Sequence, residues 1–248
     1  MEFVERLKAH RGKTTILTGA GVSTPSGIPD FRSPNGIYSK YDPERLFDLE
    51  MFMKDPSYFY SFAIENIFTM KNAEPNIVHI LIAHFEEKGL IKGVITQNID
   101  MLHEKAGSKN VAEVHGNIKS GHCIKCGKRY SLEDIEKRAK NSPDKVARCD
   151  CNSPIKPDIV FFKEMLPETE IKKAYDMLED STLIVTMGTS LSVYPAASFP
   201  KVVLRNGGEL VILNATPTSL DSFALEIERE PLEEFAKKVL LDIRKSGT

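Results

Sequence analysis

Short apolar runs alternate with longer amphipathic stretches along most of the chain. The apolar runs are rich in aliphatic and β-branched residues, as buried strands are, and they lie at 14–18, 91–96, 111–114, 159–162, 183–187 and 210–213. The amphipathic stretches have helical spacing and lie at 2–10, 77–89, 168–178, 196–206 and 231–244. This alternation predicts an α/β fold with a doubly wound, Rossmann-like parallel sheet.

Two segments depart from this rhythm. From about 32 to 75 aromatic residues cluster without strand alternation, which predicts a mostly helical insertion. Residues 118–157 have little continuous apolar pattern and contain all four cysteines. We therefore expect a Rossmann-like domain formed by 1–117 and 158–248, and a separate metal-binding module at 118–157.

Composition narrows the class of protein. The chain has 248 residues, 41% apolar and 27% charged, with a formal net charge of -2. This balance is typical of a globular domain and gives no reason to expect direct binding to nucleic acid or to a membrane. The first residues lack the apolar core of a signal peptide, so we expect a cytoplasmic protein. We also expect a monomer.

The cysteines form two close pairs separated by 22 residues: Cys123 with Cys126, and Cys149 with Cys151. In a reducing compartment such pairs indicate metal ligands more often than disulfides. Four thiolates suit a closed tetrahedral zinc site that stabilises the fold and leaves no position for substrate. The alternative is four unrelated buried cysteines.

Glycine-rich turns follow two of the predicted strands. Gly19, Ala20 and Gly21 follow the first, but Thr24 stands where a dinucleotide-binding fingerprint has its third glycine. Gly188 begins a similar turn after 183–187. Ligands of open α/β sheets bind at the carboxyl ends of the strands, although either turn alone also fits an ordinary strand-to-loop connection.

Several ordered motifs resemble the sirtuin family of NAD-dependent protein lysine deacylases. The stretch 19–32 (GAGVSTPSGIPDFR) is similar to the first family signature, and 96–100 (TQNID) to the second. Val114-His115-Gly116 resembles the catalytic histidine motif, and the cysteine pairs resemble the family's zinc ribbon. The likeness extends from about residue 13 to residue 216.

The resemblance implies a binding site for NAD, used as a co-substrate, and one structural zinc ion. The implied NAD contacts are Gly19, Ala20, Gly21, Thr24, Asp30, Phe31, Arg32, Gln97, Asn98, Ile99, Asp100, His115, Gly188, Thr189, Ser190 and Asn214. Phe31 would cover the nicotinamide, Arg32 would contact phosphate, and Asp100 would lie beside the carboxamide. Without the family likeness, Asp30 and Arg32 also fit a surface ion pair, residues 97–100 a capped polar loop, and Asn214 a strand-end turn.

His115 is the implied general base, and Asn98 is implied to act beside it near the ribose and a bound water. An imidazole titrates close to neutral pH, which suits proton transfer, and Gly116 is expected to leave room for substrate. The implied partner is an acetylated protein or peptide, bound as an extended strand against Val160, Phe162 and Val193.

The implied reaction transfers the acetyl group of N6-acetyl-lysine to ADP-ribose and releases nicotinamide and O-acetyl-ADP-ribose. Members that prefer acidic acyl groups have a Tyr with an Arg three residues later. Here Tyr60 is followed by Ala63, which favours a neutral acyl group. Lys163 stands where the family usually has glycine, and the segment after Asn214 matches loosely. An NAD-linked dehydrogenase, a protein ADP-ribosyltransferase and a non-enzymatic zinc-ribbon module remain as alternatives.

Overall fold

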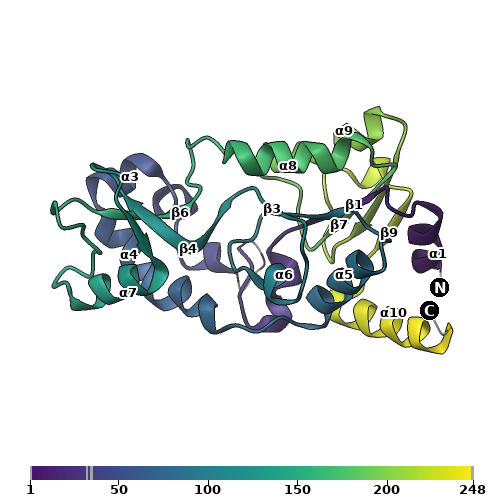
Figure 1. Ribbon diagram of the computed structural model, residues 1–248, viewed down its shortest axis with the longest axis horizontal. Coiled ribbons are helices and arrows are strands. Elements are labelled where there is room, and N and C mark those ends of the chain that lie inside the picture. Colours follow the sequence, from purple (N-terminus) through teal and green to yellow (C-terminus); the bar gives the residue numbers. More distant parts are fainter. Residues whose placement is uncertain (1, 32, 34–35, 247–248) are drawn as a thin grey trace.

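The computed structural model describes residues 2–31, 33 and 36–246. They form an elongated molecule with a large lobe around a parallel sheet and a small lobe at the opposite end (Figure 1). The sheet confirms the predicted doubly wound architecture. Its strands lie in the order β3 (Val111–Glu113), β2 (Gly93–Thr96), β1 (Thr14–Thr18), β7 (Leu183–Met187), β8 (Glu209–Leu213) and β9 (Glu226–Glu228).

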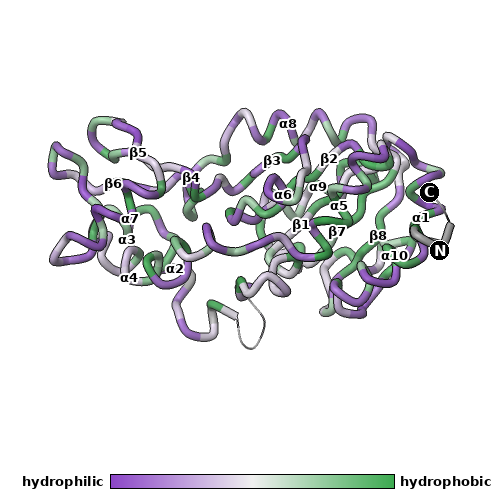
Figure 2. Tube along the Cα trace, turned by 60° about the horizontal axis from the view of Figure 1, so that its bottom comes forward, coloured by the Kyte–Doolittle hydropathy of each residue, from purple (hydrophilic) through white to green (hydrophobic). Residues whose placement is uncertain are grey.

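Helices cover both faces of this sheet. One face packs against α1 (Glu2–Ala9), α5 (Ile77–Glu87) and α10 (Leu232–Ser246), and the other against α8 (Glu168–Glu179) and α9 (Phe199–Arg205). Successive strand residues alternate between the faces: Ile16 joins the first cluster and Leu17 the second. Every residue of the central strands β1 and β7 is buried, including the threonines of β1, because helices cover both faces of the sheet, and hydrophobic residues gather around these strands (Figure 2).

Short helical turns complete the large lobe. They are α6 (Leu102–Lys105) and the 3-10 turns η1 (Ala20–Val22), η2 (Thr24–Ser26), η5 (Ala196–Ser198) and η6 (Asp221–Phe223). Two of these turns, η1 and η2, directly follow β1 and carry part of the sequence-predicted NAD loop.

The small lobe combines the helical insertion with the four-cysteine segment. A three-stranded antiparallel sheet has the order β5 (Arg129–Ser131), β4 (Gly116–Cys123) and β6 (Ile155–Ile159). The helix α7 (Leu132–Asn141) comes directly after β5 in the chain and belongs to the same core. The insertion is helical, as predicted, and contains η3 (Ile37–Ser39), α2 (Pro43–Leu46), α3 (Leu49–Lys54), α4 (Pro56–Asn66) and η4 (Phe68–Asn72).

These two parts share one hydrophobic cluster, in which Phe59 and Phe62 of α4 and Ile135 of α7 are all buried. We therefore propose that the insertion and the metal-binding segment form one folding unit, whereas the sequence assigned the insertion to the Rossmann-like domain.

The prediction of a strand at 159–162 is wrong. The strand here is β6, four residues earlier, and it pairs with β4 of the small sheet. The sequence concealed it because Lys156 and Asp158 interrupt the apolar pattern, yet the stem and ammonium of Lys156 are buried. Within the described residues no helix is long and apolar enough to cross a bilayer.

Candidate active site

A cavity of about 800 Å³ opens at the carboxyl ends of β1, β2, β7 and β8 and extends to the segment that follows β6. Almost all the sequence-predicted site residues line it: Gly19, Ala20, Gly21, Thr24, Asp30, Phe31, Gln97, Asn98, Ile99, His115, Val160, Phe162, Gly188, Thr189, Ser190, Val193 and Asn214. Asp100 is absent from the wall, and Arg32 lies outside the described residues. The cavity thus joins the predicted dinucleotide and peptide segments in one space.

The two glycine turns pack directly against each other at the point where the strand order reverses. A Cβ on Gly21 would lie 2.8 Å from the Cα of Gly188, so both turns require glycine for this approach. The Gly21 N–H donates to the Gly188 carbonyl at 2.9 Å. This junction is the usual ligand site of a doubly wound sheet.

Two amides after β2 donate hydrogen bonds to the two glycine-rich segments. Asn98 Nδ2 donates to the Gly19 carbonyl and to Ser23 Oγ, both at 3.1 Å. Since a carbonyl only accepts, the amide orientation is fixed, and Oδ1 is the Asn98 atom that can accept a hydrogen bond from a ligand. Gln97 Nε2 donates to Thr189 Oγ1 at 2.9 Å and thereby ties β2 to the second turn.

Asp100 lies behind the cavity wall. Ser23 Oγ donates to its Oδ2 at 2.7 Å and the Leu102 N–H to its Oδ1 at 2.9 Å, and burial raises the pKa of this carboxyl. Its geometry supports a role in positioning Ser23 and Asn98. The expected direct contact with nicotinamide would require it to become exposed to the cavity.

His115 lies on the cavity wall, two residues after the end of β3. Its Nδ1 is 3.1 Å from the Gln97 carbonyl oxygen. Because that oxygen can only accept, Nδ1 carries the hydrogen, and Nε2 of the neutral ring is left as the proton acceptor. The backbone therefore selects the tautomer that a general base needs.

Glycine is required at position 116 for a different reason from the one expected. Its φ is +73°, and a Cβ there would lie 2.0 Å from the Asp158 carbonyl oxygen. Glycine permits β4 to approach β6 at this point; it does not enlarge the substrate space. Close packing here brings the Val160 N–H to the His115 carbonyl at 2.9 Å, which joins the predicted peptide segment to the base.

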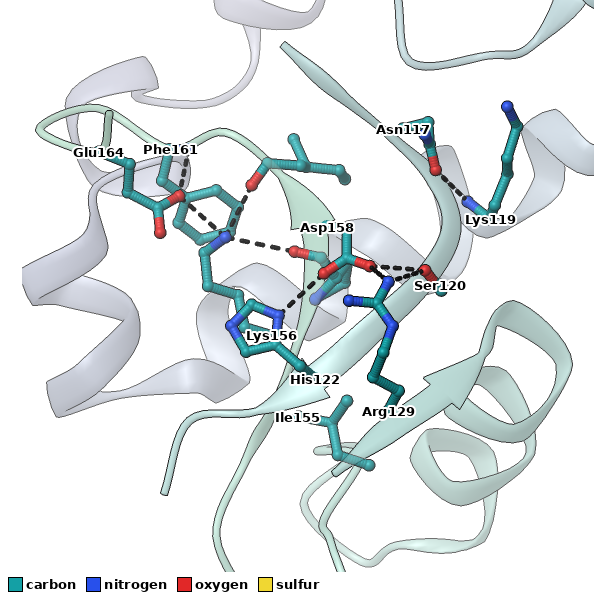
Figure 3. A network of polar contacts seen from close by, with 12 residues as sticks. Asn117, Lys119, Ser120, His122, Arg129, Ile155, Lys156, Asp158, Phe161 and Glu164 are labelled. Atoms are coloured by element: carbon teal, nitrogen blue, oxygen red, sulfur yellow. Dashed lines mark hydrogen bonds and ion pairs between the residues drawn. The ribbon is translucent and has the colours of Figure 1, made fainter. Parts of the chain in front are cut away.

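A buried lysine organises the segment that carries Val160 and Phe162. Lys156 Nζ donates to the Ile159 carbonyl at 2.7 Å and pairs with Glu164 at 2.8 Å, above the ring of Phe161 (Figure 3). Glu164 also accepts the Phe161 N–H at 2.7 Å. Burial lowers the pKa of Lys156, and Glu164 opposes that shift.

Asp158 holds the start of the same segment from the other side. Its carboxylate accepts from Ser120, His122 and Arg129, which come from β4 and β5 (Figure 3). These partners hold the pKa of Asp158 at about 2, against the effect of burial. The segment 158–164 is therefore held at both ends by its own contacts.

Asn214 begins the far wall. Its Nδ2 donates to the Thr216 carbonyl at 2.8 Å, and Arg229 Nη1 donates to the Asn214 carbonyl at 2.7 Å. The wall continues with Ala215 and Thr216, in the segment that matches the family loosely, and with residues that the sequence did not suggest: Glu230, Pro231, Leu232 and Glu233. Pro231 signalled the start of a helix, but no local pattern indicated that this helix end faces the cavity.

The four cysteine sulfurs form a cage at the tip of the small lobe, all within 4.8 Å of one another. Their Sγ atoms are 3.5 Å apart for Cys123–Cys151 and for Cys126–Cys149, and 3.8 Å apart for Cys126–Cys151. A tetrahedron with Zn–S bonds of about 2.3 Å has edges of about 3.8 Å, so the donor set fits one zinc ion. Tyr130 donates to Cys149 Sγ at 3.1 Å and orients that ligand.

Tyr60 and Ala63 do not meet the premise of the acyl-selectivity argument. Both are fully buried in the small-lobe core and neither lines the cavity. The Tyr60 hydroxyl donates to the Ile155 carbonyl. An acyl group in the cavity would contact other residues than these two.

Comparison with known proteins places this arrangement in a family. The model of the Sir2 family matches residues 19–195. An NAD-dependent protein deacetylase of Thermotoga maritima is 49% identical over 240 residues, which are 96% of each chain. A Sir2 structure with a deacetylated p53 peptide and 3'-O-acetyl ADP ribose superposes with a TM-score of 0.93 at 48% identity, covering 97% of each chain. A Sir2–p53 peptide–NAD+ structure gives a TM-score of 0.90 at 46% identity, covering 99% of this chain and 98% of the other. The chain belongs to the Sir2 family.

Proposed function

We propose that this protein removes acetyl groups from lysine side chains and transfers them to ADP-ribose, consuming NAD and releasing nicotinamide. One observation carries the proposal: His115, with Nε2 as its proton acceptor, shares a cavity with the turns that would bind NAD and with the segment that would bind an acyl-lysine peptide. An NAD-dependent relative at 49% identity over nearly the whole chain supports it.

The residues divide the work along the cavity. The packed turns at Gly21 and Gly188 would receive the pyrophosphate, because residues without a side chain permit its close approach to the backbone. Asn98 Oδ1 would orient a ribose hydroxyl or a water. NAD supplies an electrophilic ribose carbon when nicotinamide leaves. His115 would take the proton of a ribose hydroxyl at Nε2, while the Gln97 carbonyl stabilises the charged ring.

The peptide side of the cavity favours a neutral acyl group. Its wall includes Phe47, Ile99, Ile159 and Phe161, and Lys163 is a cation already paired with two carboxylates. No arginine lines the cavity among the described residues. We propose acetyl and similar uncharged acyl groups as substrates.

Replacing His115 by Ala tests the assignment. We expect kcat for deacetylation of an acetyl-lysine peptide to fall about 10²- to 10⁴-fold, as the loss of a positioned general base does. Mass spectrometry should follow free lysine and O-acetyl-ADP-ribose. His84→Ala, on α5 and away from the cavity, is the control and should retain activity. Full turnover in His115→Ala would refute the base assignment.

The same assay separates the competing activities. Formation of NADH would indicate a dehydrogenase, and label from NAD retained on protein would indicate ADP-ribosyl transfer. An acyl-ADP-ribose product that requires both NAD and peptide supports the deacetylase alone.

We further propose that the zinc ion is structural, that the enzyme acts as a monomer and that it works in the cytoplasm. The cysteine cage is away from the cavity wall and uses all four thiolates, which supports the first point. Light scattering of the zinc-loaded protein and cell fractionation test the other two.

A further inference from the structure

Lys163 has a backbone conformation that side chains rarely adopt. Its φ is +74°, in the left-handed region, which explains why glycine suits this position. The side chain is 58% exposed at the cavity rim, directly after Phe162. A strained lysine at this place calls for a reason in its contacts.

Two carboxylates meet the ammonium group. Lys163 Nζ is 3.1 Å from Asp48 Oδ2 and 3.2 Å from Glu50 Oε1, at the start of α3. The Met51 N–H and the Lys163 ammonium hold the pKa of Asp48 below its ordinary value. The cluster around the Lys163 ammonium, next to the cavity rim, therefore carries two negative charges against one positive charge.

Asp48 has a fixed place beside the proposed peptide segment. Asp48 Oδ1 accepts the Met51 N–H at 2.9 Å as the N-cap of α3, and the Phe162 N–H donates to the Phe47 carbonyl at 2.7 Å. The neighbouring carboxylate, Glu164, has its own buried partner in Lys156. Lys163 is thus the group that offsets the Asp48–Glu50 pair.

We propose that Lys163 determines specificity for the peptide: its ammonium lets the enzyme accept substrates with an acidic residue adjacent to the acyl-lysine. Without it, the two carboxylates next to the rim would repel such peptides and favour basic ones. The inference rests on the proposed deacetylase function, because it assumes that the acyl-lysine peptide lies along residues 160–163.

The test compares paired acetyl-lysine peptides that carry Glu or Gln immediately before or after the acetyl-lysine. The quantity measured is the ratio of kcat/KM for the Glu peptide to kcat/KM for the Gln peptide. Lys163→Gln removes the charge and keeps the left-handed strain, whereas Lys163→Gly removes both. We expect the ratio to fall about two- to fivefold in each variant, the size typical of a partly exposed charge contact, and the change to shrink in high salt.

Two further variants sharpen the result. Glu50→Gln should raise the ratio, and Lys140→Gln, an exposed ion-paired lysine of α7, should leave it unaltered. A ratio unaltered in both Lys163 variants would overturn the proposal, and so would a change confined to Lys163→Gly, which would assign the effect to the backbone. Absence of NAD-dependent turnover with every peptide in the unsubstituted enzyme would instead contradict the proposed function.

Discussion

The two lobes of this enzyme are stabilised in different ways. The large lobe buries apolar side chains on both faces of a six-stranded sheet, as Ile16 and Leu17 do in adjacent positions of β1. The small lobe surrounds a three-stranded sheet with a thiolate cage and a buried Lys156–Glu164 pair. Hydrophobic burial contributes to both lobes, but the small lobe also depends on a few groups that must each find a particular partner.

The largest test of this difference is loss of the metal. Cys149→Ser, or a chelator, should remove binding free energy on the order of 10 kcal/mol from the small lobe, since closed thiolate sites couple metal binding to folding. We expect amide hydrogen exchange to accelerate in β4, β5 and α7 while β1 and β7 stay protected. Equal loss of protection in both lobes would contradict their separate stabilisation.

The buried lysine should give the next largest effect. Lys156→Met leaves the Glu164 carboxylate without its cation, and breaking one partner of a buried pair costs about 3–5 kcal/mol. Denaturant unfolding should report this loss. Lys140→Met removes an exposed pair with Glu136 and should change the free energy of unfolding by less than about 1 kcal/mol. Similar values for the two variants would argue against a special role for Lys156.

The large lobe contains its own polar exception, and acid tests it. Burial lowers the pKa of His79 to about 4; burial, together with His79, lowers that of His103 to about 3. Between pH 6.5 and these values the unfolded chain binds protons that the folded chain excludes, so stability falls as pH falls.

From pH 6.5 to pH 5 each buried histidine should reduce the free energy of unfolding by roughly 2 kcal/mol. Asp100, whose pKa burial raises, works in the opposite direction. Chemical unfolding at several pH values measures the sum, and His103→Asn should flatten the profile. A flat profile in the unsubstituted enzyme would show that the pair remains neutral when unfolded or charged when folded.

Sequence patterns predicted the parts of the fold that rest on burial. The apolar runs of β1 and β7 and the helical spacing of α5 and α8 correspond to observed elements with small shifts at their ends. The patterns missed β9, whose sequence Glu-Ile-Glu lies at an edge, and they misplaced β6 because a lysine occupies a buried strand position. Periodicity cannot indicate that carbonyl oxygens and a distant carboxylate will satisfy a buried ammonium.

Family motifs predicted residues of the candidate site that hydrophobic periodicity alone does not identify, such as His115 and the glycine turns. The motifs did not indicate, however, which residues face the cavity: Asp100 lies behind the wall and Tyr60 in the core. The wall at 230–233 could not be predicted, since it depends on how the start of α10 packs across the ends of the strands. Distances from the cavity follow from tertiary packing, which short sequence patterns do not encode.

The inaccessibility of Lys156 has a chemical consequence for a protein rich in surface amines. A reagent that acylates lysines will modify the exposed ammonium groups and will reach Lys156 only when the small lobe opens. The rate at which this single amine is labelled therefore reports how often the small lobe opens beside the cavity.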